Sequence, residues 1–165
     1  MLDTLLKENT HVVIRDSTLS DVAFLKSRLR QTDIDEIWAS NNLTPAEALT
    51  FSYYLSKVCL TVVYGEPVGM FGIVADPERY GRALIWMLGS ERLEKAARHV
   101  LRQTKDIIDG FMDEYPLLYN YIDARNKKSI RWLRHLGAEI NPALPHGKAG
   151  LPFHFFKFER NIIHA

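Results

Sequence analysis

Basic side chains recur on one side of a helix that the sequence predicts after Ser90. Gly89 and Ser90 close an apolar run, and four basic residues follow at helical spacing: Arg92, Lys95, Arg98 and Arg102. A helix start presents unpaired backbone N–H groups, so this pattern could bind an anion such as a phosphate. A solvated helix face shows the same pattern, and Ser90 could simply cap the helix. The sequence leaves both interpretations open.

The sequence gives little indication of a metal site or of a reactive thiol. The six histidines show no spacing typical of metal ligands, and we expect no metal site. The single cysteine, Cys59, lies in an apolar run, which favours a buried small side chain over a nucleophile. One cysteine excludes a disulfide within the chain and fits a reducing compartment.

The composition is that of a folded globular chain. The 165 residues, 47% hydrophobic and 25% charged, predict a single domain, 1–165, with residues 1–10 as a leader arm. The net charge of +1 gives no sign of a nucleic-acid partner. The first residues lack the basic and apolar regions of a secretion signal, and no apolar run approaches the roughly 20 residues that span a bilayer.

Hydrophobic periodicity predicts the elements that must position these residues. Apolar and β-branched runs predict strands at 11–15, 58–64, 68–74, 82–88, 119–123 and 152–160. Helical spacing and capping residues predict four helices, which begin near Thr18 or Ser20, at Thr44, at Ser90 and near Asn126 or Ser129. We expect the third helix to run unbroken to about Tyr115. Segment 32–42 is expected to be a helical turn or loop, and 141–152 a loop.

The order of these elements indicates the fold class. Three consecutive strands are followed by a strand–helix alternation, which favours an α/β (α+β) fold. We expect a mixed, mostly antiparallel central sheet with helices on both faces. The strands at 82–88 and 152–160 are apolar on both faces, so both should be internal in the sheet.

The stretch YNYIDARNKKSIRWLRHLGAEI, 119–140, carries the most specific pattern. A strand leads to Asn126, then an amphipathic helix, then Gly137 and Ala138. This stretch and the element order resemble the GCN5-related N-acetyltransferase (GNAT) family. The matching positions of the family's late motif are Asn126, Ser129, Ile130, Trp132, Leu136, Gly137 and Ala138.

The resemblance implies acetyl-CoA as cofactor and a set of site residues. The family's coenzyme A strand and helix match 82–88 and the helix after Ser90. They imply cofactor contacts from Met87, Leu88, Gly89, Ser90 and Arg92, with Asn126 near the pantetheine arm. Acetyl transfer to an amine also needs a proton acceptor, for which Glu36 and Asp123 are the candidates. Backbone N–H groups near Leu88 and Gly89 would polarise the thioester carbonyl. Each of these residues also has a plain structural explanation in capping, packing or surface charge.

Two departures from the family pattern concern the chemistry. The stretch MLGSERLEKA contains one glycine where the family usually has several, and bulky residues keep a pyrophosphate from the backbone. Many members carry a tyrosine that protonates the leaving thiolate, and the matching residue here is Leu133. The fold is therefore better supported than catalysis.

Within the family, the chain looks most similar to the GNAT-like internal virion proteins of short-tailed bacteriophages, through VVIRDSTLSDV, LLYNYIDARN and SIRWLRHLGAEI. This predicts a virion or head-assembly protein with reduced or absent acetyltransferase activity, located in the virion or the host cytoplasm. Its partners would be other virion or assembly proteins, and the oligomeric state stays open. The alternatives are an active acetyl-CoA-dependent N-acyltransferase and a host-takeover binding protein.

Overall fold

The computed structural model describes residues 11–160, and the expected leader arm at 1–10 lies outside them. Fourteen elements follow one another within this range. The helices are α2 (Leu19–Leu25), α3 (Gln31–Asn41), α4 (Pro45–Leu55), α5 (Leu93–His99), α6 (Leu101–Glu114) and α7 (Lys127–Leu136). The strands are β1 (Val12–Asp16), β2 (Val58–Tyr64), β3 (Glu66–Ala75), β4 (Arg82–Gly89), β5 (Leu117–Asp123), β6 (Glu139–Ile140), β7 (Leu144–His146) and β8 (Leu151–Glu159).

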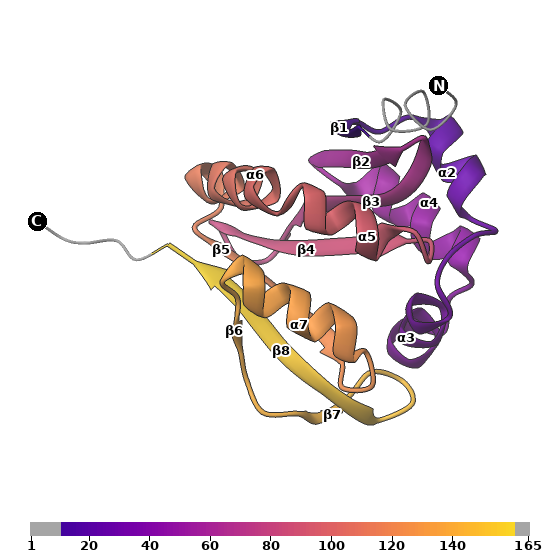
Figure 1. Ribbon diagram of the computed structural model, residues 1–165. Coiled ribbons are helices and arrows are strands. Elements are labelled where there is room, and N and C mark those ends of the chain that lie inside the picture. The colour runs from indigo at the N-terminus through magenta and orange to yellow at the C-terminus, as the bar shows by residue number, and fades with distance from the viewer. Residues whose placement is uncertain (1–10, 161–165) are drawn as a thin grey trace, which may run out of the picture.

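The strands form one mixed sheet in the order β1-β2-β3-β4-β5-β8-β6, with β7 also paired to β8 (Figure 1). Every pair is antiparallel except β4 with β5, which is parallel. The predicted hairpin of β2 and β3 is confirmed, and its turn places Gly65 at a φ of +74°. The expectation that β4 and β8 are internal is also confirmed, because each has neighbours on both edges.

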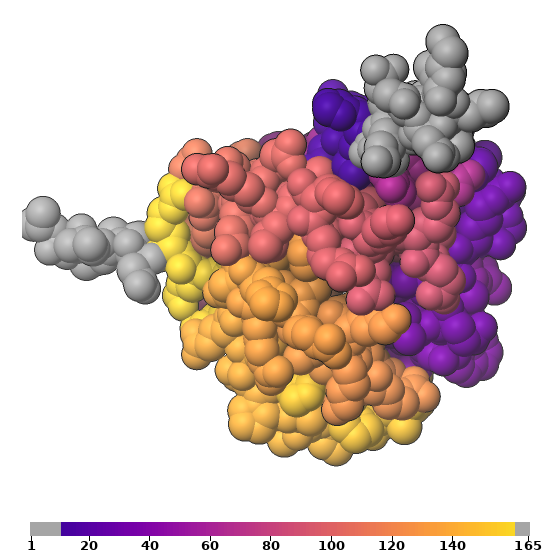
Figure 2. Space-filling model, viewed as in Figure 1, coloured from indigo at the N-terminus to yellow at the C-terminus, as the bar shows by residue number. Residues whose placement is uncertain are grey.

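Helices cover both faces of the sheet, as expected. In Figure 1, α5, α6 and α7 lie in front of the sheet and α2 and α4 behind it. One buried cluster packs the first layer against the sheet through Leu93, Ile108, Phe111 and Ile130. A second cluster packs the other layer, with Leu25, Leu49, Met70 and Leu88. Figure 2 shows the front face, where side chains of α6 and α7 (salmon and orange) close over the sheet.

Local capping signals set the start of α4 and both ends of α7. Thr44 caps α4 by accepting a hydrogen bond from Glu47 N, and Pro45 takes the first helical position. Asn126 caps α7 by accepting from Ser129 N at 3.3 Å, and Gly137 ends that helix with a φ of +96°. These local features were predicted from the sequence.

Three predictions about elements were wrong. The helix expected from Ser90 to Tyr115 is broken at Val100, which leaves the helical region and bonds to Ala97 O. Val100 is buried and β-branched, a residue type with lowered helix propensity, and the break divides the segment into the 7-residue α5 and the 14-residue α6. Segment 32–42 is more than a helical turn or loop, because all of it except Asn42 belongs to the 11-residue helix α3. The loop expected at 141–152 contains β7, whose backbone pairs with β8.

At Gly72 the sheet leaves no room for a side chain. A Cβ built on Gly72 would lie 2.3 Å from Val58 O of the neighbouring strand. We expect Gly72→Ala to lower the free energy of unfolding by about 1–3 kcal/mol, because the strands must move apart. Gly110→Ala in α6 is the matched control, since its Cβ would meet no atom within 4 Å. It should raise stability by about 0.5–1 kcal/mol. Urea unfolding measures both changes, and equal stabilities would contradict the prediction.

Candidate active site between two diverging strands

Strands β4 and β5 lie side by side for three residues and then separate. Arg82–Leu84 pair with Leu117–Tyr119, and the ladder ends there. Asn120 follows on β5 and bridges the start of the gap. Its Nδ2 donates to Ile85 O at 2.8 Å, and its Oδ1 accepts from Tyr121 N. Beyond Ile85, the facing edges of β4 and β5 therefore form no backbone hydrogen bonds with each other.

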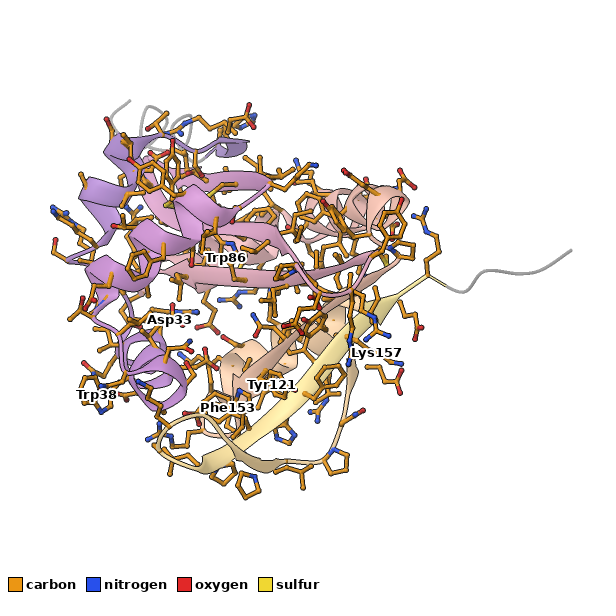
Figure 3. The ribbon with its side chains drawn as sticks, turned by 180° about the vertical axis from the view of Figure 1, so that it is seen from behind. Asp33, Trp38, Trp86, Tyr121, Phe153 and Lys157 are labelled. Atoms are coloured by element: carbon orange, nitrogen blue, oxygen red, sulfur yellow. The ribbon has the colours of Figure 1, made fainter. Side chains whose placement is uncertain are left out.

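A cavity of about 700 Å³ occupies the divergence. It reaches both helical layers, since α3 and α4 contribute Glu36 and Phe51, and α6 and α7 contribute Thr104 and Trp132. Figure 3 shows Asp33, Trp86 and Tyr121 around this region, while Trp38 points outward from α3. Most lining side chains are apolar, so polar groups in the cavity can act selectively.

The backbone of Met87 is the open part of the β4 edge. Along β4, the backbone N–H and C=O groups of successive residues point alternately toward β3 and toward β5. On the β5 side, Ile85 O accepts from Asn120, Gly89 N donates to Asp33 Oδ2 at 2.9 Å, and Gly89 O accepts from Arg30 N. Met87 lies between them, and residues 11–160 provide no partner for its N–H or C=O. A chain that carries amide groups could bind here as an added strand does.

Glu36 brings a carboxyl group to the same cavity. Its Oε1 accepts a hydrogen bond from Asp123 N at 2.6 Å, which joins α3 to the end of β5. Burial is the main cause that raises the pKa of Glu36 to about 8, and the nearby carboxylates Asp33 and Asp123 add to it. A carboxyl group with this pKa exchanges protons near neutral pH. The Glu36 carboxyl group can therefore take up and release a proton near neutral pH.

The other candidate base, Asp123, is held differently. Its buried carboxylate accepts three side-chain hydrogen bonds from Arg125 and one from Arg125 N, at 2.7 to 3.2 Å. Burial acts to raise the pKa of Asp123, but the Arg125 bonds and charge outweigh it and leave the pKa below its ordinary value. Asp123 does not line the main cavity. The structure therefore brings Glu36 and Asp123 together but gives only Glu36 the environment of a base.

The residues proposed to hold a pyrophosphate have other partners. Gly89 N donates to Asp33, Ser90 N donates to Val68 O at 2.9 Å, and Arg92 N donates to Ser90 Oγ. The Arg92 side chain pairs with Glu66 at 2.6 Å, toward the β2–β3 turn. Leu88 faces β3 through its pairing with Met70. The N–H groups of Leu88 and Gly89 are therefore not free to polarise a carbonyl in the cavity.

Three features of the site were not predicted from the sequence. Asp33, which is 1% exposed, ties the start of α3 to the end of β4 through Gly89. An aromatic wall forms where His146 stacks on Tyr121, with ring centroids 3.8 Å apart. Trp132 also lines the cavity. The sequence offered one clue to the site, which is Asn120, a polar residue between the aromatic residues of β5.

Two further properties were assessed over residues 11–160. No helix there combines the length and apolar composition needed to cross a bilayer. Within the same residues, no group of three or more His, Cys, Asp and Glu side chains is arranged to hold a metal ion.

Comparison with solved structures defines the fold. The chain is similar to the aminoglycoside acetyltransferase AAC(6')-Ib, solved with coenzyme A, at a TM-score of 0.64 and 18% identity over 91% of this chain and 95% of that one. It is similar to yncA, a putative acetyltransferase from Salmonella typhimurium solved with acetyl-CoA, at a TM-score of 0.64 and 16% identity over 93% of this chain and 96% of that one. It is also similar to Ard1 from Thermoplasma volcanium, at a TM-score of 0.67 and 15% identity over 92% of this chain and 99% of that one.

These similarities show that the chain has the GNAT fold, as its sequence suggested. At these identities they establish the fold alone. No protein-family model and no curated protein sequence matches the chain.

Proposed function

We propose that this protein is an N-acyltransferase that moves an acetyl group from a coenzyme A-type thioester to an amine. The observation that carries the proposal is one cavity lined by both Glu36 and the unpaired backbone of Met87. An acyl transfer to an amine needs a proton acceptor and a donor for the carbonyl oxygen. Similar structures solved with coenzyme A or acetyl-CoA support the choice of thioester.

The residues fit one part of this ligand and not another. A pantetheine arm carries two amides in a slim, largely apolar chain, which suits the Met87 edge and the apolar cavity. Asn126 lines the cavity too, and its Oδ1 is used by Ser129 N, so its amide nitrogen would be the group that holds the arm. The pyrophosphate has no comparable cradle, because the N–H groups of Gly89, Ser90 and Arg92 are already engaged.

Glu36 and Met87 divide the proposed chemistry between them. When bound, the thioester supplies the carbonyl carbon that the amine attacks. Ionised Glu36 accepts the proton that an ammonium group must lose before it can attack. The Met87 N–H is the backbone donor placed to stabilise negative charge on a carbonyl oxygen in the cavity. Leu133 also lines the cavity but cannot donate a proton, so the leaving thiolate takes its proton from another group in the cavity or from solvent.

The partial fit predicts an unusual binding preference. We expect acetyl-CoA and S-acetyl-pantetheine to bind with dissociation constants within about fivefold of each other, because the nucleotide half of coenzyme A should add little to the binding free energy. Isothermal titration calorimetry measures both constants. Arg92→Ala is the matched control and should leave both unchanged, since Arg92 pairs with Glu66. Acetyl-CoA binding about 100-fold tighter would contradict the prediction, and no binding of either thioester would remove the proposed function.

We also propose, as a second candidate, a role in a bacteriophage particle or its assembly with little catalysis. The observations that favour reduced catalysis are Leu133 at the proton donor's position and the engaged N–H groups of Gly89 and Ser90, and the particle role rests on the sequence resemblance alone. Mass spectrometry of purified virions tests this role, and absence of the chain from particles excludes it. A host-takeover binding role would instead return one host protein in a pull-down from infected cells.

A further inference from the structure

Trp132 carries a buried hydrogen-bond donor with no acceptor. Its indole Nε1 is the one buried side-chain nitrogen or oxygen in the described part of the chain that lacks a partner. The other two tryptophans differ. Trp86 Nε1 donates to Ser56 Oγ at 2.8 Å, and Trp38 is 61% exposed and open to solvent. The unpaired N–H is therefore particular to Trp132.

Leaving this donor unpaired is unfavourable. A buried donor without an acceptor costs about 1–3 kcal/mol, and buried indole N–H groups usually find a partner. Trp132 lies on α7 and lines the cavity between β4 and β5. Asn126 and Ser129 line the same cavity from earlier turns of this helix segment. A ligand carbonyl that entered the cavity and displaced the side chains covering this N–H would supply the missing acceptor.

The surroundings indicate the chemistry of the acceptor. Leu133, Leu136 and Ile108 line the cavity with Trp132, and all three are apolar. Arg30 is the single arginine or lysine side chain lining it, and that charge is paired with Asp33 at 2.9 Å. An anionic phosphate would find no free counter-charge here. An uncharged carbonyl oxygen on a slim, apolar chain would suit both the donor and its neighbours.

We infer that Trp132 is a ligand-positioning residue whose indole N–H donates to a carbonyl oxygen of the acyl-pantetheine arm. This inference rests on the proposed function, and it adds a second donor on the α7 side to the Met87 edge on β4. Because an indole N–H is a donor that does not release its proton, Trp132 holds the arm and does not replace an acid. The adjacent Leu133 keeps the apolar wall.

Trp132→Phe tests the inference, because it keeps an aromatic ring and removes the N–H. We expect S-acetyl-pantetheine to bind about tenfold more weakly to this variant in calorimetry. Without ligand, its melting temperature should fall by less than that of Trp86→Phe, because both variants lose ring volume but only Trp86→Phe also breaks a hydrogen bond. Trp38→Phe is the matched control and should change neither quantity. Trp86→Phe should lower the melting temperature, because it breaks the bond to Ser56.

A second readout follows the donor itself. The three indole N–H resonances of the ¹⁵N-labelled protein can be assigned with the three Phe variants, and S-acetyl-pantetheine should shift the Trp132 resonance downfield. Binding to the wild type with an unmoved Trp132 resonance and an unchanged Trp132→Phe constant overturns the inference and leaves the proposed function standing. No binding to the wild type overturns the proposed function, and the inference with it.

Discussion

Replacing Glu36 with glutamine is expected to lower kcat/KM for acetyl transfer by roughly 10²- to 10⁴-fold, the range that a positioned general base contributes. Glutamine has nearly the same shape, and its Oε1 can still accept from Asp123 N. The variant should therefore keep the fold and lose the proton acceptor. The rate of thiol release from acetyl-CoA, measured with a panel of primary amines, gives kcat/KM.

The pH profile adds a sharper signature. Since the pKa of Glu36 is about 8, the wild-type rate should rise as the pH increases toward 8 and level off above it. Glu36→Gln should lose that inflection along with its activity. Asp35→Asn is the control, because Asp35 is exposed on the same helix and bonds only to Gln31. It should keep both the rate and the profile. A Glu36→Gln enzyme with wild-type kcat/KM would show that another group accepts the proton.

The raised pKa of Glu36 also has a consequence for stability, with a definite sign. The ordinary value is 4.5, so the folded chain holds this proton more tightly than the unfolded chain does. The resulting stabilisation is fully present below about pH 4.5 and is lost as the pH rises through about 8. Glu36→Gln does not titrate. Its free energy of unfolding should therefore fall less than that of the wild type between pH 5 and 8.5.

The sequence predicted those parts of the site that depend on neighbouring residues. Asn126 caps α7 through a bond to Ser129, three positions away, and Gly137 ends the helix through its own φ. Both residues carry their structural role in their type and spacing. The same holds for Thr44 and Glu47 at the start of α4.

The open cleft itself could not be predicted in this way. Its bonds join distant positions: Asn120 to Ile85 across 35 residues, Asp33 to Gly89 across 56, and Glu36 to Asp123 across 87. No local pattern encodes which partner such a side chain meets. Two of the three bonds come from α3, a helix whose sequence lacks a side-chain cap and a clear apolar stripe. Because α3 was not expected as a full helix, neither was the burial that raises the pKa of Glu36.

Asp33→Asn is expected to be the most destabilising of the substitutions considered, lowering the free energy of unfolding by about 3–5 kcal/mol. The Asp33 carboxylate is 1% exposed and accepts two hydrogen bonds from Arg30, at 2.9 and 3.1 Å, and one from Gly89 N. The amide can still accept from Gly89 N. It removes the hydrogen-bonded counter-charge of the largely buried Arg30 guanidinium, and that is the dominant penalty.

A double mutant separates the charge from the shape. Arg30→Met combined with Asp33→Asn removes the buried charge while keeping an acceptor for Gly89 N, so the pair should be more stable than Asp33→Asn alone. Asp35→Asn, two positions along α3 and exposed, should change stability by less than about 0.5 kcal/mol. Guanidinium unfolding of the four proteins gives the comparison. If Asp33→Asn lost less than about 1 kcal/mol, the Arg30–Asp33 pair would not be what anchors α3 to the end of β4.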